Sequence, residues 1–206
     1  MGLAINVGLA SFDEDGVAQH RAALDRLSAA LGAEGVGWSE PVGDAPPMRR
    51  HVGGFPYSCL RYLRRVLVLT DAGEPVPPAD RADNLDRDWR EIDERSSMLD
   101  SHLVCHSDSA GFFVPVDLDD PLFLPTEAGV EGGGIVGSSL ALRDELRRCA
   151  APLGIHLDGG ELSDVEAERI FRLPTDAPFA TESMVWLTLF EACRVSLASG
   201  HAIVFH

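Results

Sequence analysis

The stretch that most constrains the fold is an apolar segment near the end of the chain, ATESMVWLTLFEACRVSLASG at residues 180–200. Its polar positions Thr188, Glu191 and Arg194 form only a narrow stripe, which predicts a helix buried around most of its circumference. The glycine that ends the segment is a typical helix C-cap. The apolar run AIVFH at residues 202–206 predicts a closing strand. The chain therefore ends in a buried helix and a strand, which indicates a core shared by helices and a sheet.

The rest of the sequence predicts strands in both hairpin and crossover positions. Residues 2–10 and 101–108 are expected to be central strands, and residues 111–117 the antiparallel partner of the second. Helices are expected at residues 17–31, 55–71, 138–154 and 164–173, although residues 65–70 would also suit a strand, and residues 119–134 are expected to be loop. This order predicts an α+β fold with a mixed β-sheet and helices packed on it.

The length of 206 residues suits one domain with a single core. Residues 72–100 are rich in proline and in charge, and we expect them to be a linker or an insertion with a short helix around Trp89 and Ile92. The sequence therefore predicts one α+β domain over residues 1–206, interrupted by this charged excursion.

The charge balance separates the classes of partner. Thirty-three acidic residues against seventeen arginines, with no lysine, give a formal net charge of −16. Such a surface repels nucleic-acid phosphates and favours encounter with a basic protein. No apolar run reaches the roughly 20 residues of a membrane-spanning helix, and the N-terminus lacks the basic region of a signal peptide. We therefore expect a cytoplasmic protein that binds neither nucleic acid nor membrane.

The main cationic cluster in this acidic chain consists of Arg49, Arg50, Arg61, Arg64 and Arg65. The last three would share one face of a helix. A cluster of this kind could bind an anion, but arginines in an acidic protein more often pair with nearby carboxylates. We expect ion pairs here.

The motif SHLVCHSDSAG at residues 101–111 is the main candidate for catalysis or metal binding. His106 and Asp108 lie where the expected strand ends and exposes its polar groups. A neutral imidazole and a carboxylate suit a zinc site or a general base. The alternative, which we favour, is structural: Ser107 and Asp108 form a turn, and His106 bonds to a backbone carbonyl. On that interpretation the protein needs no cofactor, and on the metal-site interpretation it binds zinc.

A second histidine, His102, lies four residues before His106, and the local structure decides whether the two can meet. In a strand they would stand about 13 Å apart, which is too far to share a metal ion. In a helix their spacing would fit a zinc pair. The apolar run LVC between them favours the strand.

Two other features carry weaker chemical signals. The glycines of EGGGIVGSSLALRDE, residues 131–145, precede a helix N-terminus, as in anion-binding loops, but the lysine of a P-loop is missing. We expect a flexible loop and a helix N-cap at Ser138 or Ser139. The cysteines are widely spaced and predict free thiols at Cys59, Cys105, Cys149 and Cys193.

Three features together resemble a known group of proteins: the opening MGL strand, the central HSDSAG with a following proline, and the final AIVFH after a long helix. They resemble small bacterial proteins, some of which are grouped with the immunity proteins of polymorphic toxin systems. The arginine-only cations and the abundant alanine, glycine, aspartate and leucine also resemble actinobacterial proteins. The resemblance implies an acidic, cytoplasmic, non-enzymatic protein that acts by masking a toxin.

Two hypotheses of different classes follow. The first is an immunity-type binding protein that captures a basic protein partner through its acidic surface, with Trp38, Trp89 or Phe112 in an apolar contact patch. The second is a small metal-dependent hydrolase centred on His106 and Asp108. We favour the binding protein.

Overall fold

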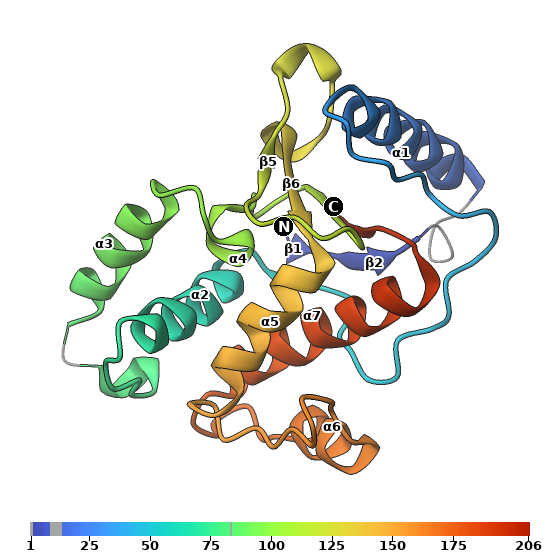
Figure 1. Cartoon of the computed structure of the whole chain (residues 1–206). Helices are drawn as coiled ribbons and strands as arrows, with labels where there is room; N and C mark the ends of the chain where they lie inside the picture. Colours follow the sequence, from blue (N-terminus) through green and yellow to red (C-terminus); the bar gives the residue numbers. More distant parts are fainter. Residues whose placement is uncertain (1, 9–13, 83) are drawn as a thin grey trace.

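The computed structural model describes residues 2–8, 14–82 and 84–206, and these residues form an α+β fold (Figure 1). A five-stranded mixed sheet lies at the centre, and a separate two-stranded ribbon accompanies it. Helices pack on both faces of the five-stranded sheet. The fold class expected from the sequence is thus confirmed.

The central sheet has the strand order β2-β7-β4-β6-β5. Its strands are β2 Ile5–Val7, β4 Gly111–Val114, β5 Leu122–Phe123, β6 Ile135–Ser138 and β7 Ile203–Phe205. β4 and β6 run parallel, whereas the other neighbouring pairs are antiparallel. The ribbon pairs β1, Gly2–Leu3, with β3, Phe55–Pro56. The strand expected at residues 202–206 is therefore confirmed as β7, and it pairs with the beginning of the chain.

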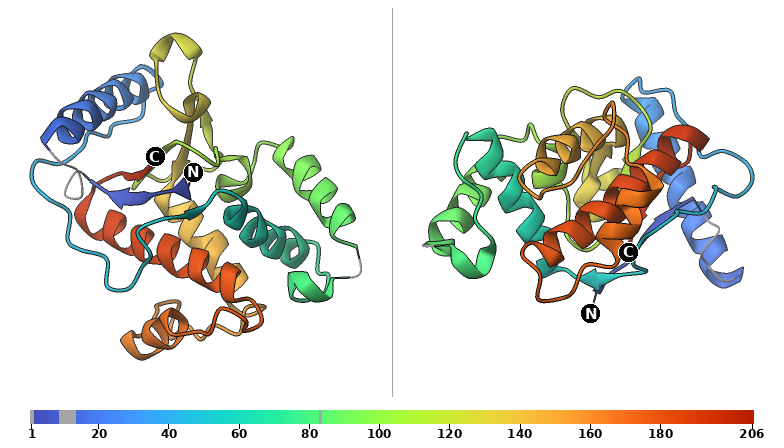
Figure 2. Two further views of the ribbon diagram at one scale, coloured as in Figure 1. Left: turned by 180° about the vertical axis from the view of Figure 1, so that it is seen from behind. Right: turned by 90° about the horizontal axis from the view of Figure 1, so that it is seen from below.

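Alternate side chains of the sheet enter two separate hydrophobic cores, as the two-residue period of a strand requires. On one face, Phe112 and Val204 pack against helix α1, Glu14–Ala33, which supplies Leu24, Leu27 and Leu31. On the other face, Phe113 and Phe205 join a larger core formed with α2, Ser58–Asp71, α5, Ser139–Ala150, and α7, Ala180–Ser199. Consequently α1 and α7 lie on opposite faces of the sheet (Figure 2).

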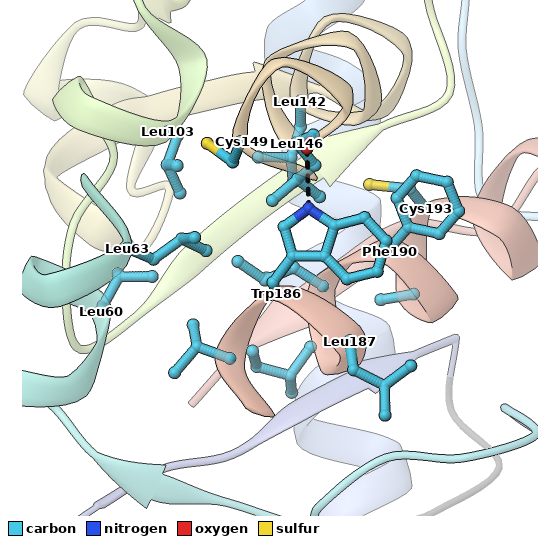
Figure 3. Close-up of a cluster of buried hydrophobic side chains, with 14 of the residues drawn as sticks. Leu60, Leu63, Leu103, Leu142, Leu146, Cys149, Trp186, Leu187, Phe190 and Cys193 are labelled. Carbon is cyan, nitrogen blue, oxygen red and sulfur yellow. Dashed lines mark hydrogen bonds between the residues drawn. The ribbon is translucent and has the colours of Figure 1, made fainter. Parts of the chain in front are cut away.

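Helix α7 is buried as the sequence predicts, and its aromatic side chains fill the larger core (Figure 3). Trp186 and Phe190 lie one turn apart and stack, with 4.6 Å between ring centroids and an interplanar angle of 15°. Nε1 of Trp186 donates a hydrogen bond to the carbonyl oxygen of Leu146 in α5 at 2.7 Å. This bond satisfies the polar atom of the indole inside the core. Gly200 ends the helix with a φ of 83°, so the expected C-cap is confirmed.

The helix boundaries follow local capping signals. Ser138 caps α5 by accepting from the backbone N–H of Ala141 at 3.2 Å, as expected. Residues 65–70, open between helix and strand, are helical within α2. The further helices are α3, Leu85–Ser96, and α6, Asp164–Phe171. The short helix expected around Trp89 and Ile92 is therefore present as α3, and it packs on α2.

The strand expected at residues 101–108 is wrong, because a short helix stands there. Ser101 caps α4, His102–Cys105, by accepting from the N–H of Val104. Glu145 of α5 accepts from the N–H groups of His102 and Leu103, at 3.0 and 2.7 Å. Arg64 of α2 donates to the carbonyl oxygen of Leu103 at 2.9 Å. Charged side chains from α2 and α5, which are distant from α4 only along the sequence, therefore hold α4 in place. The apolar run LVC lies buried within this short helix.

The placement of the other strands also differs from expectation. The opening strand is divided between β1 and β2, and β2 lies at an edge of the sheet rather than at its centre. Residues 9 and 10, which were expected to extend it, lie outside the described residues. β4 pairs with β6 and β7, because residues 101–108 offer no strand. Residues 119–134, expected to be loop, contain β5, which pairs with β6.

Candidate functional site

His106, the leading candidate for catalysis, is buried against the sheet. It is 3% exposed, and its ring stacks on Phe113 with 4.1 Å between centroids. Nδ1 lies 3.0 Å from the carbonyl oxygen of Ser107, and Nε2 lies 3.2 Å from that of Phe112. Burial lowers the pKa of His106 to about 4, so the imidazole is neutral at physiological pH. Both ring nitrogens face backbone carbonyls, and the neutral ring donates to one of them, so its observed contacts are structural.

Asp108, the second candidate, forms an ion pair with Arg64 of α2. The same guanidinium donates from Nη2 to the carbonyl oxygen of His106 at 2.5 Å. Arg64 thereby ties the turn after α4 to α2. The carboxylate of Asp108 is occupied by this cation, and among the described residues no hydrogen bond joins it to the imidazole of His106.

His102 does not share a helical face with His106. The backbone of His106 is already extended, with φ −66° and ψ 149°, because α4 ends at Cys105. Nδ1 of His102 instead accepts from the N–H of Ser138 at 2.9 Å. Within residues 2–8, 14–82 and 84–206, no group of three or more His, Cys, Asp or Glu side chains is placed to hold a metal ion. All four cysteines are free, as expected.

The three aromatic residues expected in a contact patch lie in different settings. Phe112 is 1% exposed in β4 and faces α1, so it presents no surface to a partner. Trp38 is half-buried, and its Nε1 donates to the carbonyl oxygen of Gly200 at 3.1 Å. Trp89 is half-buried on α3 under the guanidinium of Arg61, whose Cζ lies 5.0 Å from the ring centroid. These residues secure local packing rather than forming one continuous patch.

All five arginines of the cluster form ion pairs, as expected from the sequence. Arg64 pairs with Asp108, and the buried Arg65 bonds to Asp88 at 2.6 Å. The remaining pairs are Arg49 with Asp164 and Glu191, Arg50 with Glu168, and Arg61 with Asp93. Most other arginines, on α3, α5, α6 and α7, also pair with carboxylates. The cations of the protein are therefore used mainly inside its own fold.

One stretch of the chain is longer than any other without an arginine. Residues 96–142 contain seven acidic residues and no arginine. Their most acidic part, residues 115–134, is named here the acidic loop, and its carboxylates belong to Asp117, Asp119, Asp120, Glu127 and Glu131. The first four are exposed, and none of the five forms an ion pair with another described residue. This loop therefore keeps its negative charge unopposed.

An aromatic side chain lies in the middle of the acidic loop. Phe123, on β5, is 46% exposed. Because β5 is the last strand of the sheet, its outer edge has no strand partner among the described residues. The segment that follows β5, yellow in Figure 1, protrudes beyond the sheet edge.

The glycines of the acidic loop fix its shape. Gly132 has a φ of 71°, and a Cβ at this position would lie 2.4 Å from the carbonyl oxygen of Ala110. A Cβ at Gly134, φ 77°, would lie 2.5 Å from the carbonyl oxygen of Leu124. Only glycine fits such positive φ values at so close an approach. The EGGG run therefore anchors the loop to its neighbours.

A family model described as "Putative DNA-mimic protein" matches residues 1–205 of the chain. The chain belongs to this family. Neither a search of curated proteins nor a search of solved structures returned a significant match.

In this member of the DNA-mimic family, no sequence motif pointed to the acidic loop. The signal was present as a run of 47 residues, 96–142, without one of the seventeen arginines. Net charge alone hides such a run, because it averages paired and unpaired carboxylates. The exposure of Phe123 has no comparable signal, since an apolar strand residue is usually buried.

Proposed function

We propose that this protein binds a DNA-binding protein and occupies the surface with which that partner contacts DNA. The support is the family match over residues 1–205 together with exposed carboxylates that no internal cation neutralises. The observation that carries the proposal is the segregation of charge, with arginines paired inside the fold and the acidic loop left free.

The physical basis is the similarity between two negatively charged surfaces. DNA-binding proteins place lysine and arginine to neutralise phosphates, and this contact supplies much of their affinity. A folded surface of carboxylates offers the same sign of charge to the same cations. With a net charge of −16, the protein would also attract a basic partner before contact and speed their association.

An immunity role is one form of this proposal, in which the partner is a toxin with a basic, DNA-contacting surface. The same electrostatics disfavours binding of the protein itself to nucleic acid. Binding to the partner and the absence of binding to DNA can both be tested with the partner and one labelled DNA duplex.

The first experiment identifies a partner and then tests competition. The purified protein is immobilised and exposed to a lysate of its source organism, with polyglutamate of equal charge as the control for simple ion exchange. A captured DNA-binding protein is purified and loaded with fluorescein-labelled duplex DNA. Addition of the protein is expected to lower the fluorescence anisotropy of that DNA as the DNA is released.

The expected competition weakens as salt rises, because both binding events depend on the same cations. A captured partner that keeps its DNA while it binds the protein would overturn the proposal. So would a set of captured proteins that is the same on polyglutamate and on the protein.

A further inference from the structure

The geometry points to the acidic loop, residues 115–134 with Phe123 at its centre, as the face that docks onto the basic DNA-contacting surface of the partner. This inference rests on the proposed function and deepens it by naming the contact face. The occupant is a protein surface rich in arginine or lysine, chosen by charge complementarity.

The exposed carboxylates of the acidic loop have no cation paired with them in the part of the chain that the structure describes. Asp117, Asp119, Asp120 and Glu127 lie within eleven residues, are exposed, and have no ion pair among the described residues. Neighbouring like charges repel one another when no cation separates them. A partner that brings cations to this face removes the repulsion and gains the attraction, whereas a partner at an already paired face must first break existing ion pairs.

The second step is the exposed aromatic ring in the same stretch. Aromatic side chains are enriched at the centres of protein interfaces, where burial of their large apolar surface provides much of the binding energy. Phe123 is such a residue, and it lies on the open edge of the sheet. Arginine side chains also stack on aromatic faces, so a basic partner suits this ring.

The third step is the rigidity of the loop. β5 pairs with β6, and the N–H of Leu124 donates to the carbonyl oxygen of Gly134 at 2.9 Å. Leu124 is buried in the core under α1. The carboxylates are therefore held in place before binding, which lowers the ordering entropy that association would otherwise cost.

An independent observation at the base of the loop concerns His102. His102 is 2% exposed, its Nδ1 accepts from the N–H of Ser138 at 2.9 Å, and its imidazole hydrogen-bonds to the backbone of Asp119 and Leu118. Burial lowers the pKa of His102, opposed by the backbone of Asp119 and Leu118 and by the charge of Asp120, so these loop groups lie beside the imidazole. Buried polar atoms rarely stay unpaired in native proteins. The backbone of Leu118 and Asp119 therefore joins the base of the loop to the buried imidazole of α4.

The test uses the full-length protein and a nona-arginine peptide as the probe, with a nona-glutamine peptide as the uncharged control. Chemical-shift changes of the ¹⁵N-labelled protein locate the contact. They are expected to concentrate in residues 115–134, and the nona-glutamine peptide is expected to cause none. Changes concentrated on α3 or α6 would overturn the inference while leaving the competition experiment to judge the proposed function.

Two variants with the same change in net charge separate location from overall charge. The loop variant carries Asp117→Asn, Asp119→Asn, Asp120→Asn and Glu127→Gln. The control variant carries Glu34→Gln, Asp44→Asn, Asp158→Asn and Asp176→Asn, four exposed positions without ion pairs among the described residues. The loop variant is expected to bind nona-arginine about tenfold more weakly and the control variant less than about threefold. Equal weakening of the two would overturn the inference.

The aromatic contribution has an equally matched control. Phe123→Ala is compared with Phe171→Ala, because Phe171 on α6 is 48% exposed against 46% for Phe123. Phe123→Ala is expected to weaken nona-arginine binding about two- to fivefold, and Phe171→Ala is expected to leave it unchanged. Equal effects would remove Phe123 from the contact face. Thermal unfolding of each variant verifies that the fold persists.

Discussion

Two neighbouring stretches of the chain use the same number of carboxylates in opposite ways. Residues 79–95, which include most of α3, contain seven acidic residues and four arginines, whereas residues 96–142 contain seven acidic residues and no arginine. In the first stretch the carboxylates of Asp80, Asp88, Glu91 and Asp93 pair with arginines, and Asp88 reaches the buried Arg65 of α2. In the second, Asp100 and Asp108 pair with arginines, whereas the four exposed carboxylates of the acidic loop have no ion pair among the described residues. A net charge of −16 therefore does not distinguish paired from unpaired carboxylates, whereas the ion pairs of the folded chain do.

This difference gives the two stretches different roles. Acidic residues of the paired stretch are expected to support stability, because their removal leaves an arginine without a partner. Acidic residues of the acidic loop are expected to support binding at a small cost in stability. Measurements of stability on single substitutions test this division of roles.

The largest expected effect is at the buried ion pair of the paired stretch. Arg65 is 1% exposed, and Asp88→Asn would leave its charge in the core without a counter-charge. The expected loss in the free energy of unfolding is about 3–5 kcal/mol, measured by urea denaturation. Asp86→Asn, at an exposed position two residues earlier, serves as the control and is expected to change stability by about 0.5 kcal/mol or less. Similar effects of the two would contradict a stabilising role for the pair.

The second prediction concerns how the free energy of unfolding depends on pH through the buried imidazole of His106. Burial lowers the pKa of His106 to about 4, below the value near 6.5 of an unfolded chain. The unfolded state therefore binds more protons between these values, so the contribution of His106 is present above pH 6.5 and is lost as pH falls toward 4. A pKa difference of this size corresponds to about 3 kcal/mol. Unfolding free energies of the wild type and of His106→Gln, measured from pH 7.5 to 4, are expected to show a steeper fall for the wild type.

Parallel curves for these two proteins would contradict a neutral, buried His106. Phe190→Leu, a core substitution on α7 without a titrating group, is the matched control and should run parallel to the wild type. The zinc-site interpretation makes a different prediction: metal bound to purified wild-type protein that is lost in His106→Gln. Mass spectrometry of both proteins separates the two.

A third prediction probes the shape of the acidic loop. Gly132→Ala places a Cβ against the carbonyl oxygen of Ala110 at a φ of 71°. The strain is expected to cost about 1–3 kcal/mol. Gly133 has a similar φ of 72° but open space around it. Gly133→Ala therefore introduces only the unfavourable backbone conformation and is expected to lower the free energy of unfolding less than Gly132→Ala. Equal effects would mean that the contact with Ala110 does not hold the loop.

The sequence predicted those elements whose causes are local. Helix α7, its cap at Gly200, the Ser138 cap of α5 and strand β7 all follow from apolar patterning and capping within a few residues. Helix α4 did not, because its ends are held by Glu145 and Arg64, about 40 residues away along the chain. Strands β5 and β6 were missed because both lie in residues 119–139, whose glycines and prolines are typical of loops.

The candidate site shows the same limit. His106 and Asp108 were singled out because their side chains can do chemistry, yet burial against Phe113 and pairing with Arg64 decide what they do. The first contact depends on the turn between α4 and β4, and the second comes from α2, which is distant along the chain. The arginine-free run could be read from the sequence, whereas the exposure of Phe123 required the sheet order.

The smallest expected effect is the sharpest test of the comparison. Asp119→Asn with Asp120→Asn removes two adjacent exposed charges that no described cation neutralises. Their mutual repulsion disfavours the folded state, so the double variant is expected to gain up to about 0.5 kcal/mol in the free energy of unfolding at low salt. The gain should vanish at high salt, because salt screens exposed charges. Proteins often retain locally unfavourable features where function needs them. A gain in stability combined with weaker binding of a basic probe would indicate that these carboxylates serve binding rather than stability. A loss of stability would instead indicate that they stabilise the fold, as the carboxylates of the paired stretch do.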